Sequence, residues 1–175
     1  MINKILNEGV LVNRMKEENI EIIKLEDSNN EIFDIICKWN YNWWGKRNHN
    51  SFEEVRCNLK HSLCKNRLPQ TFVARIDGKP VGMYQLSMTE DLESRPDIYP
   101  WLINVYVEEK YRGHHIGRKL LETVNENAKK ANLKELFLYT KHRGLYEKFG
   151  WEFIEYVETF KSDSPIERLY KLKIK

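Results

Sequence analysis

The chain has 175 residues, of which 41% are hydrophobic and 31% are charged, and its formal net charge is +3. This length and composition fit one globular domain with its own core and exclude a disordered chain. The small positive excess is finely mixed with acidic residues, so it does not indicate a nucleic-acid partner. No apolar run is long enough to span a membrane, and the polar start of the chain does not resemble a signal peptide.

The three cysteines, Cys37, Cys57 and Cys64, are odd in number and lack the paired spacing of a zinc site. Reduced thiols of this kind indicate a cytoplasmic protein, and we expect no bound metal and no membrane partner. Residues 1–19 are weakly patterned and are predicted to be an N-terminal extension. Residues 20–175 are predicted to form one domain.

The first predicted elements of this domain are a strand and two helices. Residues 20–25 alternate and are rich in β-branched side chains, which is typical of a strand. Residues 27–30 offer N-cap side chains for a helix that is expected to reach about Trp44. Ser51, three residues before Glu54, predicts a capping box at the start of a second helix.

A hairpin and an acidic loop come next. The Asp77-Gly78 pair lies between two strand-like runs and predicts a tight turn. The loop that follows, from Glu90 to Tyr99, is rich in acidic residues. It leads into a further strand, which we expect at about residues 100–107.

The stretch from Ile103 to Ala131 joins that strand to a helix through a turn with two glycines. From Ile116 onward the apolar residues fall at helical spacing. The first turn of a helix leaves N–H groups without partners and carries partial positive charge. With Gly113 and Gly117 allowing close approach, the stretch predicts an anion site, most naturally for phosphate. An ordinary strand-to-helix connection with solvated basic residues is the alternative.

The rest of the chain predicts a strand at 134–140, a short helix at 142–149, and two alternating strands at 151–157 and 167–174. The strand at 134–140 follows the preceding strand through one helix, so the two are expected to be parallel neighbours with a right-handed crossover. The whole chain then has about seven strands and four helices in a single α/β domain with a mixed sheet.

Three segments resemble, in order and spacing, the GNAT N-acetyltransferases. The segment RGHHIG, from Arg112 to Gly117, resembles their acyl-CoA-binding motif, Arg/Gln-x-x-Gly-x-Gly/Ala. The segment LYEKFGWEF, from Leu145, resembles their C-terminal segment, and the Asp77-Gly78 hairpin matches the one that precedes their cofactor strand. His115 departs from the motif, which has glycine there. It keeps the backbone N–H, at the cost of a side chain that must avoid the phosphate or of a positive φ.

The resemblance implies a mostly antiparallel sheet in which one parallel pair, 100–107 and 134–140, is splayed. It implies acetyl-CoA as the acyl donor, with the pantetheine arm pairing with the backbone of the cofactor strand and the pyrophosphate at the turn. On this basis the cofactor-binding residues are Val105, Tyr106, Val107, Arg112, Gly113, His114, His115, Ile116, Gly117, Arg118, Thr140 and Tyr146.

The resemblance also implies the catalytic groups. An alkylamine has a pKa of about 10, so a base must remove its proton before it attacks the thioester. The cofactor strand lacks the glutamate that many relatives place there, and the acidic loop offers Glu90, Asp91, Glu93 and Asp97 instead. Asp91 is the first choice because it closely follows a strand. Tyr146 matches the tyrosine that serves as general acid in many relatives.

For the acceptor, the resemblance implies a primary amine on a small molecule or a peptide, bound by Trp43, Trp44, Asp91 and Trp101. The sequence does not choose between a cationic acceptor and one with a carboxylate, because Arg47 and Arg95 lie in the same segments. A homodimer is compatible with the resemblance. A non-catalytic acyl-CoA-binding or regulatory module of the same fold is the alternative function.

Overall fold

A computed structural model describes residues 19–175 except 91, 93 and 160–165. Its strands are β1 (Glu21–Lys24), β2 (Gln70–Ile76), β3 (Lys79–Ser87), β4 (Trp101–Val107), β5 (Glu135–Thr140), β6 (Glu152–Glu158) and β7 (Ile166–Lys173). The helices of more than one turn are α2 (Glu31–Asn40), α3 (Phe52–His61) and α4 (Ile116–Lys130). Nearly all of the predicted extension over 1–19 therefore lies outside the described residues.

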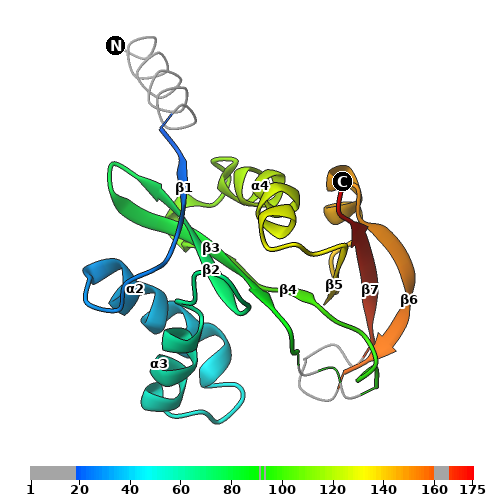
Figure 1. The fold of residues 1–175 in the computed structure, drawn as a ribbon, viewed down its shortest axis with the longest axis horizontal. Coiled ribbons are helices and arrows are strands. Elements are labelled where there is room, and N and C mark those ends of the chain that lie inside the picture. The colour runs from blue at the N-terminus through cyan, green and yellow to red at the C-terminus, as the bar shows by residue number, and fades with distance from the viewer. Residues whose placement is uncertain (1–18, 91, 93, 160–165) are drawn as a thin grey trace, which may run out of the picture.

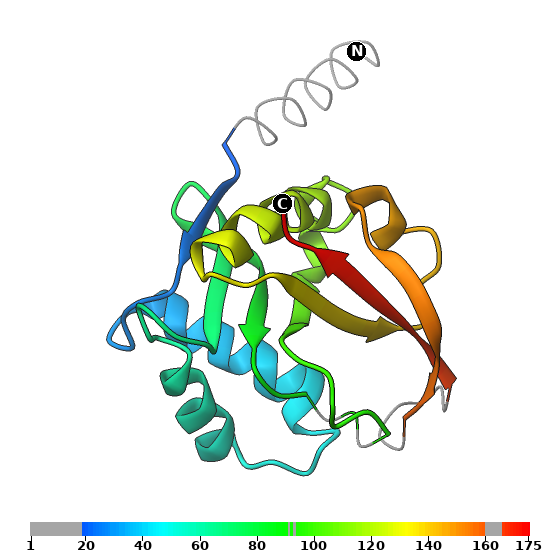
Figure 2. The same cartoon turned by 45° about the vertical axis from the view of Figure 1, so that its right-hand side comes forward.

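The described strands form one seven-stranded sheet in the order β1-β2-β3-β4-β5-β7-β6. Neighbouring strands are antiparallel except β4 and β5, which are parallel. Figure 2 shows β7 lying between β5 and β6. The predicted α/β domain with a mixed, mostly antiparallel sheet is confirmed.

The two predicted helix starts are formed by the expected capping side chains. The Asn30 side chain accepts a hydrogen bond of 2.8 Å from the Phe33 N–H at the start of α2. At the start of α3, the Glu54 N–H donates to Ser51 Oγ, and the Ser51 N–H donates to the Glu54 carboxylate. Caps of this kind are worth about 1 kcal/mol each, so local sequence places both helix starts.

The ends of the helical segments differ more from the prediction. After α2 the chain continues as a π-helical turn, Tyr41–Gly45. The predicted helix over 142–149 is wrong in extent, because only the 3₁₀ turn Tyr146–Phe149 forms. Gly144, with φ +76°, adopts a left-handed conformation, and this breaks the predicted helix before Tyr146. No helix of the described residues is long and apolar enough to cross a membrane.

Alternate residues of the central strands face two different helical layers. Phe72 and Ala74 of β2 belong to the core cluster that includes α4, whereas Val73 between them packs with the buried residues of α2 and α3. Figure 1 shows α4 on one side of strands β2 and β3 and the α2–α3 pair on the other. The sheet therefore separates two cores.

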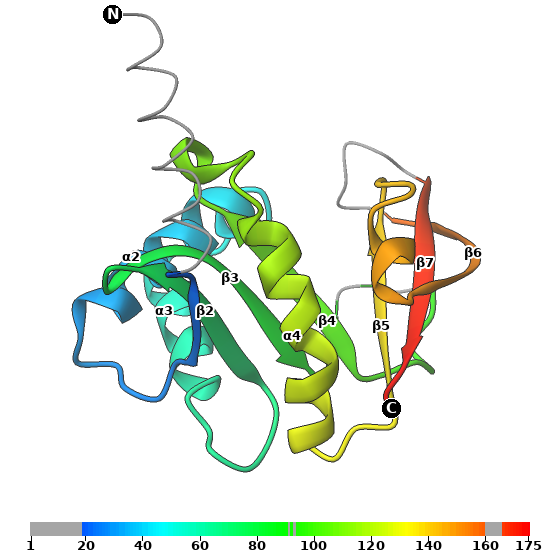
Figure 3. The same ribbon diagram turned by 90° about the horizontal axis from the view of Figure 1, so that it is seen from above.

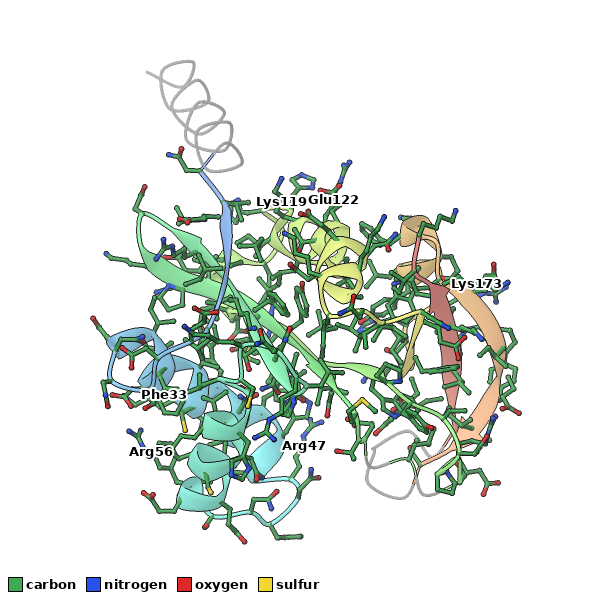
Figure 4. All side chains as sticks on the ribbon, viewed as in Figure 1. Phe33, Arg47, Arg56, Lys119, Glu122 and Lys173 are labelled. Carbon is green, nitrogen blue, oxygen red and sulfur yellow. The ribbon has the colours of Figure 1, made fainter. Side chains whose placement is uncertain are left out.

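The helix pair α2–α3 is held together as a unit. Arg56 of α3 donates a hydrogen bond of 2.6 Å to Asp34 of α2, and its guanidinium lies 5.1 Å from the ring centroid of Phe33. Figure 4 labels Phe33 on α2 and Arg56 on α3. This contact joins α2 to α3, and the two helices together form one wall of the cavity described below.

Strands β4 and β5 pair at one point and then diverge. Their register contains the single pair Trp101↔Phe137, next to which the Phe137 N–H donates to the Pro100 carbonyl at 2.9 Å. Beyond that point β4 remains paired with β3, and β5 with β7. Figure 3 shows the two halves of the sheet separating from this junction, with α4 in front of the gap. The predicted splayed parallel pair is confirmed.

Candidate active site

The turn between β4 and α4 presents unpartnered backbone donors. Among the described residues, the N–H groups of Gly113, His114, Ile116 and Gly117 have no acceptor. Gly113 has φ +80°, and α4 begins at Ile116, so these donors gather at the N-terminus of a 15-residue helix. Such a cluster, with the positive end of the helix dipole, is suited to an anion such as phosphate.

His115 adopts the left-handed conformation at the N-cap of α4, with φ 59° and ψ 8°, and its side chain makes no capping hydrogen bond. The positive φ is one of the two alternative costs that the sequence predicted for a histidine at this position. For a residue with a Cβ, this conformation costs roughly 1–2 kcal/mol. The backbone thus takes a glycine-like path although the residue is histidine.

The basic side chains around the turn make contacts with other parts of the protein. Arg112 Nε donates to the Val107 carbonyl at 3.1 Å, and the guanidinium lies 5.5 Å from the Trp43 ring centroid. Arg118 donates at 2.8 Å to Glu122, one turn further along α4. These two guanidinium groups therefore take part in protein contacts of their own.

A β-bulge lies in the splayed part of β4. The register with β3 shifts between the pairs Met83↔Tyr106 and Gln85↔Ile103, and Asn104 has φ 53° at that place. On either side of Tyr106, which packs towards α2, Val105 and Val107 pack on the α4 side. The bulge therefore sets which backbone groups of β4 face the gap towards β5.

Tyr146 begins the 3₁₀ turn that follows β5, and it is buried, with 8% of its surface exposed. Its ring packs against Trp151 and Tyr170. Among the described residues its hydroxyl has no hydrogen-bond partner, and burial raises the pKa of Tyr146 to about 12. Thr140, at the end of β5, accepts a hydrogen bond from the His142 N–H at 3.2 Å.

A cavity of about 590 Å³ lies between the α2–α3 layer and strands β3 and β4. We call it the amide cavity, because its lining is rich in side-chain amides: Asn40, Asn48, Asn50, Asn58, Gln85 and Asn104. Among the described lining residues, Glu90 and His61 can carry charge, and no lysine or arginine is present. The cavity reaches Ile103 and Asn104, so it meets the splayed strand at the bulge.

The structure separates the residues that were predicted to bind the acceptor. Trp44 lines the amide cavity, whereas Trp43 is 43% exposed and packs against Tyr106 outside it. Trp101 is 2% exposed and packs against Phe137 and Tyr139 beneath the junction of β4 and β5. Its position is that of a core residue.

The acidic residues of the loop also lie in different places. Asp91 lies outside the described residues. Asp97 is bound to Arg95 at 2.9 Å, and hydrogen bonds from that guanidinium lower the pKa of the Asp97 carboxyl. Glu90 lines the amide cavity and accepts a hydrogen bond of 3.1 Å from the Tyr139 hydroxyl. Of the acids in the loop that the structure describes, Glu90 is the one that lines the cavity reaching β4.

A buried polar chain runs beneath the cavity and was not predicted. Asn104 Nδ2 donates to Gln85 Oε1 at 2.5 Å, and Gln85 Nε2 donates to Thr71 Oγ1 at 2.8 Å. Thr71 contacts Ser62, whose hydroxyl donates to the Leu59 carbonyl at 2.7 Å. A sequence signal was present, because a polar amide such as Asn104 is unusual within a β-branched strand.

The backbone at position 115 gives a direct prediction about stability. A His115→Val substitution places a β-branched residue in the left-handed region and should lower the free energy of unfolding by roughly 1–2 kcal/mol. His115→Asn should change it much less, because asparagine tolerates this conformation. Urea unfolding of the three proteins measures the difference, and equal stability of the Val and Asn variants would contradict the left-handed N-cap.

Solved structures with this fold contain coenzyme A. An aminoglycoside 6′-N-acetyltransferase complexed with coenzyme A aligns over 89% of this chain and 97% of its own, with 11% identity and a TM-score of 0.67. The NatC complex bound to Gag peptide and CoA aligns over 90% and 99%, with 20% identity and a TM-score of 0.66. A GNAT family acetyltransferase from Elizabethkingia anophelis with acetyl-CoA bound aligns over 89% and 98%, with 20% identity and a TM-score of 0.58. At these identities the likeness shows the fold alone.

No curated protein sequence matches the chain. The family model described as "Acetyltransferase (GNAT) family" matches residues 29–151, which span β4, the turn and α4. This match covers well over half of the chain. The splayed strands, the donor-rich turn and this match lead to one conclusion, that the chain belongs to the GNAT family of acetyltransferases.

Proposed function

We propose that the protein is an acetyl-CoA-dependent N-acetyltransferase that acetylates a primary amine. The observation that carries the proposal is the placement of the amide cavity. It meets β4 at the Asn104 bulge, within the stretch where β4 has left β5. A cofactor lying between β4 and β5, with its phosphates at the start of α4, would present its acyl end to a molecule bound in this cavity.

The residues at the turn fit the cofactor. The pyrophosphate would be held by the unpartnered backbone donors named above, those of Gly113, His114, Ile116 and Gly117, with Arg112 contacting the Val107 carbonyl behind the turn. Val105 and Val107 would offer backbone groups to the pantetheine arm, and Tyr106 would anchor the strand by packing among Trp39, Trp43 and Trp44. When bound, acetyl-CoA supplies the acetyl group as an activated thioester. A β4 N–H at the bulge would stabilise negative charge on the thioester oxygen.

The acceptor amine must lose a proton, and Glu90 is the described acid that lines the cavity. Its carboxylate is oriented by the Tyr139 hydroxyl, which comes from β5 on the far side of the gap. We assign Glu90 the role of proton acceptor, acting directly or through water. Asp91, the first choice from the sequence, remains a candidate at the neighbouring position.

Tyr146 would act on the departing sulfur. Its hydroxyl has no partner among the described residues, and a pKa of about 12 keeps it protonated. A thiol has a pKa near 8.5, so complete proton transfer to the thiolate is uphill by several pKa units. Tyr146 is therefore assigned as a hydrogen-bond donor that stabilises the leaving thiolate.

The direct test of the proposal is release of free thiol from acetyl-CoA in the presence of a broad panel of amines. The proposal expects thiol release that depends on an amine and yields its N-acetyl product. Binding of acetyl-CoA, measured by calorimetry, without turnover of any amine would favour the alternative, a non-catalytic acyl-CoA-binding module.

The phosphate turn is tested by Gly117→Leu, a bulky substitution, because the family motif accepts alanine as well as glycine at this position. A Cβ at Gly117 would meet only Val107 Cγ2, at 3.7 Å, and leucine favours a helix, so the fold should be retained. The larger side chain blocks approach of the pyrophosphate, and the Kd for acetyl-CoA should rise at least tenfold in calorimetry.

Gly82→Ala is the comparison for stability. A Cβ at Gly82 would lie 2.8 Å from the Tyr106 carbonyl oxygen, so this variant should lose roughly 1–3 kcal/mol of stability. An unaltered Kd for acetyl-CoA in folded Gly117→Leu would place the phosphate elsewhere.

The role of Tyr146 is tested by Tyr146→Phe. Removing the hydroxyl should lower kcat by about 10²-fold or more while KM for the amine changes little. Because burial raises the pKa of Tyr146 to about 12, the wild-type rate should show no alkaline decrease from this group up to about pH 10. An unchanged kcat in the variant, or a wild-type decrease near pH 9 that the variant lacks, would refute the assignment.

The role of Glu90 is tested by Glu90→Gln, with Asp97→Asn as the control from the same loop. At pH 7, kcat/KM should fall by about 10²-fold or more, because the amine is then protonated and lacks a base. The deficit should shrink as the pH approaches the pKa of the amine, when more of it arrives neutral. A deficit that is independent of pH would indicate a structural role for Glu90.

A further inference from the structure

The Tyr146 hydroxyl must reach the departing sulfur, and the inference drawn from its surroundings rests on the proposed function. The hydroxyl has no hydrogen-bond partner among the described residues, and it is not fully enclosed by protein. No polar contact within the described part of the chain therefore orients it. Its place is set by the ring, which packs against Trp151 and Tyr170, and by the backbone of the 3₁₀ turn Tyr146–Phe149.

Tyr170 of β7 contacts both the ring and the turn. It is fully buried, and its ring centroid lies 6.2 Å from that of Tyr146. Its hydroxyl donates a hydrogen bond of 2.7 Å to Glu147 Oε1, and Glu147 follows Tyr146 directly in the turn. One side chain of the sheet thus contacts the ring of Tyr146 and binds the carboxylate of its neighbour.

The Glu147 carboxylate gathers donors from the turn and from the bend before it. The hydrogen bond from Tyr170 lowers the pKa of the Glu147 carboxyl, and the backbone N–H groups of Glu147 and Gly144 lower it further. Gly144 is the left-handed residue at which the predicted helix breaks. Glu147 itself is exposed, so these hydrogen bonds compete with water and contribute little to the stability of the fold. Their consequence is the position of the turn.

Arg168 fixes the direction of the Tyr170 hydroxyl. Its Nε donates to the Tyr170 oxygen at 2.8 Å, so the single proton of that hydroxyl goes to Glu147. The Arg168 guanidinium lies 4.1 Å from the Phe153 ring centroid, and its Nη1 donates to the Tyr156 hydroxyl at 2.9 Å. Phe153 and Tyr156 are exposed aromatic residues of β6, and these contacts explain why they lie side by side there.

We propose that Tyr170 and Glu147 are positioning residues for Tyr146. By tying the 3₁₀ turn to β7, they hold the Tyr146 hydroxyl where it donates to the departing sulfur. Displacement of a reacting group by about 1 Å can cost about 10²-fold in rate, even when the cause lies away from the chemistry. Because the two residues act through Tyr146, their loss should lower kcat and leave substrate binding unchanged.

The first test is Tyr170→Phe, with Tyr84→Phe as the matched control. Both tyrosines are fully buried in the same core, and the Tyr84 hydroxyl accepts a hydrogen bond of 2.7 Å from Asn127. The substrates are acetyl-CoA and the amine of the panel that is acetylated fastest. Tyr170→Phe should lower kcat about tenfold, with KM for the amine and the Kd for acetyl-CoA unchanged, whereas Tyr84→Phe should keep the wild-type kcat. Thermal unfolding checks that both variants fold.

The outcomes separate this inference from the proposed function. A wild-type kcat in folded Tyr170→Phe, together with a slow Tyr146→Phe, would overturn the inference and leave the proposed function standing. Equal losses of kcat in Tyr170→Phe and Tyr84→Phe would also overturn it, because they would indicate a general effect on the core. Acetylation of no amine would overturn both.

A double variant separates positioning from any independent role of Tyr170. Tyr146→Phe combined with Tyr170→Phe should be no slower than Tyr146→Phe alone, because no hydroxyl is then left to position. Glu147→Gln keeps an acceptor for Tyr170 and should retain most of kcat, whereas Glu147→Leu should be as slow as Tyr170→Phe. Multiplying losses in the double variant, or equal kcat values of the Gln and Leu variants, would contradict the proposal.

Amide hydrogen exchange reports on the turn without any acceptor. The Lys148 N–H donates to the Leu145 carbonyl at 3.3 Å, and the Gly150 N–H donates to the Glu147 carbonyl at 3.2 Å. Exchange of these two amides should be faster in Tyr170→Phe than in the wild-type protein, because the turn then opens more often, and unchanged in Tyr84→Phe. Equal exchange rates in Tyr170→Phe and the wild-type protein would overturn the inference.

Discussion

The architecture depends on how β4 and β5 are joined, because a fully paired parallel ladder would leave no space for a cofactor. One pair, Trp101↔Phe137, holds the two halves of the sheet together, and both side chains are buried beneath it. The Trp101 ring lies 6.0 Å from Phe137 and 6.2 Å from Tyr139, so aromatic packing stabilises the junction where backbone hydrogen bonds are few. Trp101, which the sequence indicated as an acceptor contact, thus lies at the one point where β4 and β5 are held together.

The bulge at Asn104 connects this junction to the amide cavity. A residue in the left-handed conformation interrupts the β3–β4 ladder, and its amide is fixed by Gln85 at 2.5 Å. The polar chain ends at the Leu59 carbonyl of α3. A shift of the α2–α3 pair would therefore displace the hydrogen-bond partners of Asn104 at the bulge. An apolar core could fill the same space, but it would not orient the Asn104 amide.

The parts of the fold that sequence could predict are those set by local signals. The cap at Asn30, the capping box at Ser51 and the Asp77-Gly78 turn each act within a few residues, and all three form as expected. The amide cavity could not be predicted in this way, since Asn40, Gln85 and Asn104 come from three separate elements. The direction of individual side chains could not be predicted either. Trp43 and Trp44 are adjacent in sequence, but successive residues of a helical backbone point in different directions, and only Trp44 lines the cavity.

The turn before α4 shows why counting basic residues misleads about an anion site. The guanidinium of Arg112 is engaged by the Val107 carbonyl and the Trp43 ring, and that of Arg118 by Glu122. In the proposed site, the attraction for phosphate would then come chiefly from backbone N–H groups and the dipole of α4, which do not depend on side-chain identity. This explains how the family motif accommodates His115. The turn requires a particular backbone path, and histidine adopts it at the cost of a left-handed φ.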